Sequence, residues 1–259
     1  IKLAVQNVKI SGPTRADASN MYEPLDQLGF YARELNMLEE ALCLCRHAKE
    51  MQTSIVDDEK SAVVWVNLGC TLLQSGQLLE AEKELKQAYV LLEMRPSLDE
   101  RLMGSVMNNL GDVYESIHSN TGEESMLNQA EEAYRKAYEL TKKVDGDRSG
   151  KMAIRLGNLA SILAKRGKWE EALLMAAESI GMYEEFDGKT HTRTLQALRW
   201  YGEMNIKAGN IKKGEEILKQ ALDRTKSVWG DVHENVAAVY SSLGDAYIHL
   251  GQYSEAEFC

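Results

Sequence analysis

Apolar residues recur along this chain with the spacing of an amphipathic helix, and the same arrangement returns at a nearly constant interval. In each copy a large residue is followed directly by a small one, and in five of the six copies another apolar residue comes four positions after the large one. This spacing gathers the apolar residues on one face of a helix. The small positions, separated by 40, 42, 49, 42 and 42 residues, are Gly29, Gly69, Gly111, Ala160, Gly202 and Gly244.

A second helix is predicted after each first helix. In five of the six copies a Gly or Asn turn residue lies seven positions after the small residue, as in Asn36 and Gly76, and a second small position follows in every copy, as in Ala41 and Ala81. Small residues at such positions let two helices pack closely as a hairpin. One hairpin cannot bury both of its faces, so the copies must stack into a solenoid. The pattern therefore predicts an all-α fold of stacked antiparallel helix hairpins.

The register divides the chain into a lead-in over residues 1–19 and a solenoid of about six repeats over 20–259. The third copy is about seven residues longer than its neighbours, and Ser119–Gly122 is expected to form a protruding loop there. This insertion is either a partner contact or tolerated surface variation. The last copy stops within its second helix, which indicates that the natural protein continues. The expected repeats are 20–59, 60–97, 98–148, 149–190, 191–232 and 233–259.

The joints between hairpins also repeat. Gly188 and Gly230 lie 42 residues apart, and each is followed three residues later by a histidine, His191 or His233. Glycine suits the left-handed position that ends a helix, and Thr190 or Asp231 is expected to cap the next helix. No Cys, Asp or Glu repeats with the histidines at metal-ligand spacing, so we interpret them as structural and predict no metal site.

Composition narrows the function. A net charge of −10 argues against nucleic-acid binding, which requires basic surface. No run of about 18 apolar residues is present, so no membrane insertion is predicted. Phosphate-binding glycine loops, nucleophile elbows and HExxH motifs are absent, so we predict no catalytic residue, no cofactor and no enzyme activity.

The four cysteines form no disulfide framework. Cys43 and Cys45 are two residues apart on a predicted helix and point to different faces, and Cys70 and Cys259 stand alone. They are expected to be small buried hydrophobes in a reducing compartment. We therefore expect an intracellular, cytoplasmic protein. Import into an organelle stays open, because the sequence begins at Ile1 without a recognisable targeting pattern.

The segment Trp65–Gly69, together with Gly76, Ala81, Leu85 and Ala88, resembles the tetratricopeptide repeat (TPR). The period of about 42 exceeds the usual 34 residues. With the joint at 230–237 it resembles the long-helix subtype of the kinesin light chains. The resemblance covers about 20–259 and implies a right-handed superhelix whose first helices line a concave groove for peptides.

Steps of four, three and four residues define a stripe on the groove side of each first helix. Asn67, Asn109 and Asn158 occupy the same place in three consecutive copies, and an Asn amide can both donate to and accept from a peptide backbone. Alternatively, these Asn residues cap local backbone groups or pack within the hairpins. Trp200 interrupts the series, either as an aromatic anchor or as a side chain buried between helices. The predicted groove residues are Asn67, Gln74, Asn109, Asp112, Asn158, Ser161, Lys165, Trp200, Glu203, Lys207, Ser242 and Asp245.

We therefore predict a non-catalytic protein–protein interaction scaffold that binds an extended peptide or a partner subunit in its groove, as an adaptor or assembly factor. The partner is a protein or peptide, held transiently or as a permanent subunit of a larger complex. The groove lacks the paired Lys and Arg residues that hold a terminal carboxylate, so the tails of heat-shock proteins are not expected partners. The alternative is a regulatory or sensor solenoid that controls an effector domain outside the visible chain.

Overall fold

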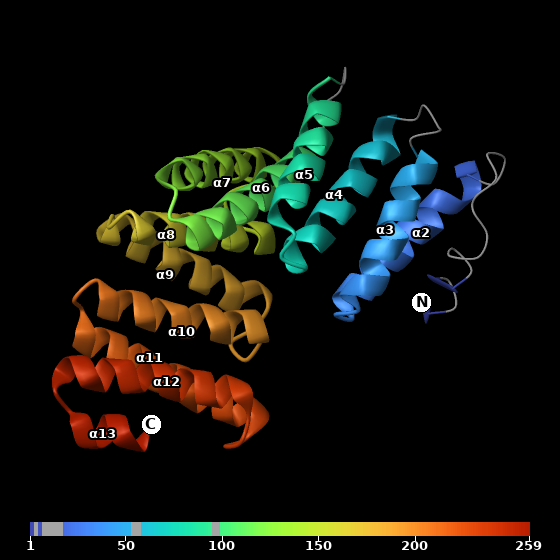
Figure 1. Cartoon of the computed structure of the whole chain (residues 1–259). Coiled ribbons are helices and arrows are strands. Elements are labelled where there is room, and N and C mark those ends of the chain that lie inside the picture. The colour runs from blue at the N-terminus through green and yellow to red at the C-terminus, as the bar shows by residue number, and fades with distance from the viewer. Residues whose placement is uncertain (3–4, 7–17, 53–57, 95–98) are drawn as a thin grey trace. The chain divides into compact units, whose positions relative to one another are not determined.

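The computed structural model describes residues 1–2, 5–6, 18–52, 58–94 and 99–259, and within these the chain is helical without strands. The chain forms two compact units, Ile1–Leu140 and Thr141–Cys259, called the N-terminal and C-terminal units below. The predicted lead-in over 1–19 lies largely outside the described residues. Successive helices lie side by side as hairpins within each unit (Figure 1), which confirms the predicted all-α fold.

Each unit is a series of α-helices. The N-terminal unit contains α2 (Ala18–Glu34), α3 (Leu38–Gln52), α4 (Asp58–Gln74), α5 (Leu78–Glu93), α6 (Glu100–Thr121) and most of α7 (Glu124–Asp145). The C-terminal unit contains α8 (Gly150–Lys165), α9 (Trp169–Phe186), α10 (Thr192–Lys207), α11 (Ile211–Trp229), α12 (Glu234–Leu250) and α13 (Tyr253–Phe258).

The small residues of the first helices allow close contact with the second helices. A Cβ atom added to Gly69 would lie 2.6 Å from Leu85 Cγ, and one added to Gly202 would lie 2.7 Å from Leu218 Cγ. Both leucines are fully buried. The turn after each first helix also has the expected left-handed residue, with φ of +76° at Gly76 and +57° at Asn36.

The two histidines of the joints are structural, as predicted, but the predicted capping residues are wrong. The caps are His191 and His233 themselves, and not Thr190 or Asp231. His191 Nδ1 accepts from the backbone N–H of Arg193 at 3.3 Å, and His233 Nδ1 accepts from Asn235 at 3.1 Å. An imidazole nitrogen acts here as the acceptor that Ser, Thr or Asp usually provides at a helix start.

The insertion of the third copy does not form the predicted loop. Helix α6 continues through Ser119 to Thr121, and the chain reverses at Gly122, where φ is +73°. Both helices of this hairpin are 22 residues long. The additional residues therefore lengthen two helices, because they continue the helical hydrogen bonding up to a single left-handed glycine.

The expectation of buried cysteines holds only in part. Cys45 is fully buried, whereas Cys43 and Cys70 are half-buried and Cys259 is exposed; all four are free thiols. Cys43 differs from Cys45 because two residues along a helix turn the side chain to another face.

Candidate functional site

Two of the predicted groove asparagines connect neighbouring first helices in the N-terminal unit. Asn67 on α4 donates from Nδ2 to Asp26 Oδ2 on α2 at 2.7 Å. Asn109 on α6 donates from Nδ2 to Cys70 Sγ on α4 at 3.0 Å. Each amide therefore has a structural contact with the preceding repeat, which is neither of the two roles considered for these residues, since it joins two hairpins and does not lie within one.

Asp26 is a buried acid that does not belong to the predicted groove stripe of its helix. It is 6 % exposed, and burial raises its pKa to about 6, although the hydrogen bond from Asn67 and the charge of Arg33 act in the opposite direction. Its Oδ1 atom is buried and has no hydrogen-bond partner among the described residues. Burial of this carboxylate between the helices therefore reduces the folding stability, most of all when the group is ionised.

Asp112 is also occupied by a contact inside its own hairpin. It accepts from the Tyr134 hydroxyl at 2.7 Å, and Glu115 accepts from the same hydroxyl at 2.8 Å. Burial, followed by the charges of the two acids, raises the pKa of Tyr134 well above its usual value. Gln74 is exposed near the end of α4. Asn67, Asn109 and Asp112 therefore form contacts that hold helices together.

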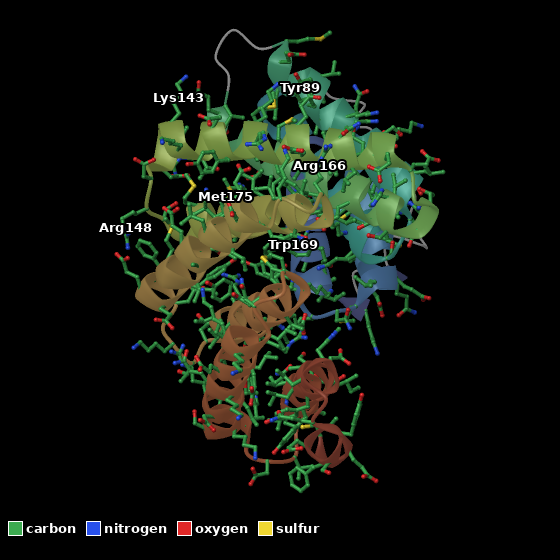
Figure 2. The ribbon with its side chains drawn as sticks, turned by 90° about the vertical axis from the view of Figure 1, so that its left-hand side faces the viewer. Tyr89, Lys143, Arg148, Arg166, Trp169 and Met175 are labelled. Carbon is green, nitrogen blue, oxygen red and sulfur yellow. The ribbon has the colours of Figure 1, made fainter. Side chains whose placement is uncertain are left out.

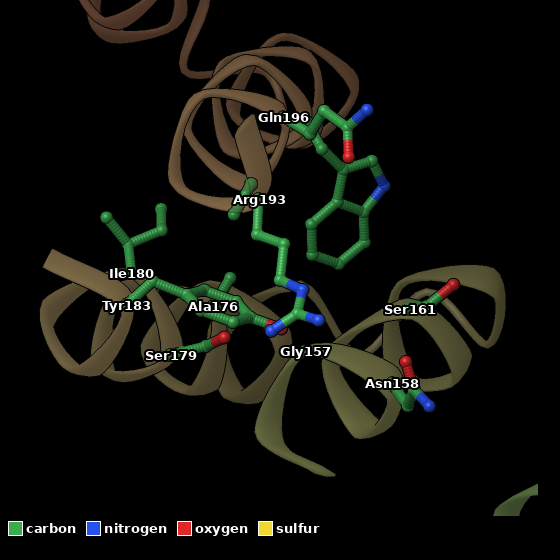
Figure 3. Close-up of a pocket in the computed structure, with 11 residues that line it drawn as sticks. Gly157, Asn158, Ser161, Ala176, Ser179, Ile180, Tyr183, Arg193 and Gln196 are labelled. Atoms are coloured by element: carbon green, nitrogen blue, oxygen red, sulfur yellow. The ribbon is translucent and has the colours of Figure 1, made fainter. Parts of the chain in front are cut away.

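Six of the eight predicted residues of the C-terminal unit, in contrast, surround a cleft between α8 and α10. A pocket of about 330 Å³ is lined by Asn158 and Ser161 from α8 and by Trp200 from α10, with α9 contributing one wall (Figure 3). A second pocket of about 230 Å³ is lined by Ser161, Lys165, Trp200, Glu203 and Lys207. The structure thus brings six of the predicted residues together around two adjoining pockets.

Trp200 lines both of these pockets and also packs against the hydrophobic core. It is half-buried and packs against a core cluster that includes Leu163, Ala176 and Met204. Trp169 and Met175 on α9 (Figure 2) pack against the same cluster. Trp200 therefore contacts the core and also lines both pockets, and its role as an aromatic anchor stays a prediction.

The charge of Glu203 is compensated by its neighbours. Arg199 Nη1 pairs with Glu203 Oε1, and Ser242 on α12 donates to the same oxygen at 2.6 Å. Lys165 and Lys207 line the same pocket and are exposed. The cleft is therefore cationic within a chain of net charge −10.

The two predicted residues on α12 lie outside the cleft. Ser242 is only 5 % exposed and serves the contact between α10 and α12. Asp245 is exposed and lines neither of the two cleft pockets.

The site also contains residues that were not predicted, above all Arg193. Arg193 lies in the first turn of α10, and both Arg193 and Gln196 line the pocket beside Asn158. A signal for Arg193 exists in the sequence. The groove stripe of this helix begins at Gln196, and Arg193 lies three residues before it, so one further step along the stripe would have reached Arg193.

Among the residues that the structure describes, no group of three or more His, Cys, Asp or Glu side chains could hold a metal ion. Nor does any described helix combine the length and apolar character needed to cross a bilayer.

Comparison with known proteins supports the repeat assignment. A family model described as tetratricopeptide repeat matches residues 103–185 and 193–259, more than half of the chain, and a second such model matches 62–89. The Drosophila melanogaster protein "Tetratricopeptide repeat protein 19 homolog, mitochondrial" is 28 % identical over 57 residues, which are 22 % of this chain and 15 % of that protein's length.

Solved structures with the same fold are found at lower identity. A Podosopora anserina protein described as a kinesin light chain with nearly identical TPR-like repeats has a TM-score of 0.63 at 17 % identity, covering 78 % of this chain and 92 % of that one. A Rap protein complexed with competence and sporulation factor has a TM-score of 0.63 at 14 % identity, covering 98 % and 76 %. The repeat register, the stacked helix hairpins and the family match agree, and the chain belongs to the tetratricopeptide repeat family.

Proposed function

We propose that this protein is a non-catalytic interaction scaffold that binds an extended peptide segment of a partner protein in the cleft between α8 and α10. The observation that carries the proposal is the position of Trp200, which is half-buried and lines both pockets. Partly buried aromatic residues with adjoining pockets are typical centres of protein interfaces.

The size of the pockets favours a peptide over a cofactor. The volumes of about 330 and 230 Å³ lie at or below the lower end of the range for drug-sized ligands, which begins at about 300 Å³. Two adjoining pockets of this size suit two side chains of one extended segment. Asn158, Ser161 and Gln196 provide amide and hydroxyl groups along the same cleft, and such groups can hydrogen-bond a peptide backbone.

A held segment would gain affinity from a cleft that is already formed. Trp200 is fixed by its packing on Leu163 and Met204, so little side-chain freedom would be lost on binding. Membership of the TPR family supports a protein or peptide as the partner. Both a transient ligand and a permanent subunit would use the same contacts.

The proposal can be tested by selecting binders from a display library of random peptides with the whole chain, then measuring their affinity by fluorescence anisotropy. Asn158→Ala and Trp200→Leu are expected to weaken the selected peptides about tenfold or more. Leucine is chosen because it keeps apolar contact with the core. The matched control is Asn109→Ala in the N-terminal unit, which should leave their affinity unchanged.

Circular dichroism at increasing temperature checks that each variant remains folded. The proposal fails if the library yields no specific binder. It fails equally if folded Asn158→Ala and Trp200→Leu variants bind the selected peptides as the parent chain does.

A further inference from the structure

The pocket between α8, α9 and α10 has a distinctive charge. Arg193 is its one cationic lining residue, and no Asp or Glu lines it. The chain as a whole has 40 acidic against 30 basic Lys and Arg residues. An acid-free pocket with a guanidinium group therefore differs from the average surface of this protein. The remaining polar lining residues are neutral: Asn158, Ser161, Ser179, Tyr183 and Gln196.

Arg193 extends from the start of α10 toward the helices on the opposite side of the pocket (Figure 3). Its side chain is 61 % exposed, and the ionic contact described for it is a distance of 3.9 Å from Nη1 to Asp187 Oδ2. This distance is too long for a hydrogen bond. Burial raises the pKa of Tyr183, and the charge of Arg193 partly offsets that rise, as expected for a guanidinium near this phenol.

We propose that this pocket selects the sequence of the bound segment by accepting the side-chain carboxylate of an Asp or Glu residue, with Arg193 as its ionic partner. The proposal rests on the function proposed above. Gln196 lies one turn along the same helix and lines the same pocket, so its amide supplies a neutral donor beside the guanidinium.

The number of positive charges favours a carboxylate over a phosphate. One guanidinium matches the two oxygens of a carboxylate through paired N–H groups. A phosphorylated side chain carries a charge of about −1.5 to −2 and is usually bound by several Arg residues. This pocket offers one. Lys165 and Lys207 line the other pocket.

The test uses the peptides selected from the display library with the unmodified chain. They are expected to share an Asp or Glu at a fixed position. Replacing that residue by Asn or Gln, or introducing Arg193→Gln, should weaken binding about tenfold, as for loss of a charged hydrogen-bonded pair. Arg193→Glu should lose the acidic peptides and prefer versions with Lys at that position, whereas Arg193→Lys should retain part of the acidic preference. Lys212→Glu on the exposed face of α11 changes the net charge by the same amount as Arg193→Glu and is the matched control for that variant.

The outcomes separate the two proposals. If selected peptides depend on Trp200 but share no acidic position, or bind Arg193→Glu as well as the parent, the carboxylate pocket is refuted while the cleft stands. A phosphoserine peptide that binds more tightly than its Glu counterpart overturns the assignment to a carboxylate. If no peptide depends on Trp200 or Asn158, the proposed function itself has failed.

Discussion

Replacing Gly202 by alanine tests whether close helix contact, and not backbone freedom, requires the small residues of the repeat. An added Cβ would lie 2.7 Å from Leu218 Cγ, 2.8 Å from Cδ2 and 3.3 Å from the Gly214 carbonyl oxygen. Leu218 is fully buried, and its Cγ is the branch point of the side chain, so rotation of a methyl group cannot remove the overlap. Helices α10 and α11 would have to separate.

The magnitude follows from two opposing terms. Overpacking of this kind costs about 1–3 kcal/mol, whereas Gly→Ala in a helix interior gains about 1 kcal/mol. Gly202→Ala should therefore lower the free energy of unfolding by about 0–2 kcal/mol. The matched control is Gly181→Ala in α9 of the same unit, where nothing lies within 4 Å of the new Cβ. This variant should be more stable than the parent by about 1 kcal/mol.

The assay is urea denaturation followed by circular dichroism, with the three proteins compared under identical conditions. The order of stability should be Gly181→Ala, parent, Gly202→Ala. If both variants are stabilised equally, the contact with Leu218 can relax without cost and the packing argument is wrong. Because repeat arrays can unfold in stages, the comparison uses midpoints of the same transition.

Three further predictions address other contacts. His233→Ala removes the 3.1 Å hydrogen bond that caps α12 and the imidazole ring that stacks on Trp229, so the thermal midpoint should fall by the equivalent of about 1–2 kcal/mol. His233→Asn restores a capping side chain and should recover much of the lost stability. Asp26→Asn should flatten the dependence of stability on pH. The pKa of Asp26, raised from 3.8 to about 6 in the folded protein, makes the parent lose up to roughly 3 kcal/mol of stability as pH rises from 4 to 7. Urea titrations of both proteins at pH 5 and 8 would detect the difference. An unchanged pH slope in the variant would contradict this. Asn109→Ala should cost about 0.5–1.5 kcal/mol by removing the hydrogen bond to Cys70, measured by thermal unfolding.

The fold could be predicted because the repeat constrains it many times over. Gly69 and Gly202 lie 133 residues apart in the chain, yet each faces a buried leucine at the same place in its hairpin. The structure of the insertion near Ser119 was predicted wrongly because Ser, Asn and Thr are common in both turns and helix ends. The difference between a loop and two longer helices depends on where a single left-handed glycine stands.

The candidate site could be predicted only in part. Periodicity identifies the face on which Asn67, Asn109 and Asn158 lie, but not the side chains that meet them from the preceding helix. Asp26 and Cys70 come from helices whose approach depends on packing, so the structural use of Asn67 and Asn109 could not be read from spacing. The cleft around Trp200 arises where two packed helices leave space between them, and volume of that kind has no local sequence signature.

In the proposed peptide-binding cleft, Trp200 would limit how a partner could be exchanged over evolution. A substitution there would change the cleft and also weaken packing on the core cluster that includes Leu163 and Met204, so a new specificity at this position would carry a loss of stability. Arg193 and Gln196 are exposed and make no such core contribution. Variation between relatives that bind different segments should therefore concentrate at these two positions, while the indole is retained as the fixed part of the cleft.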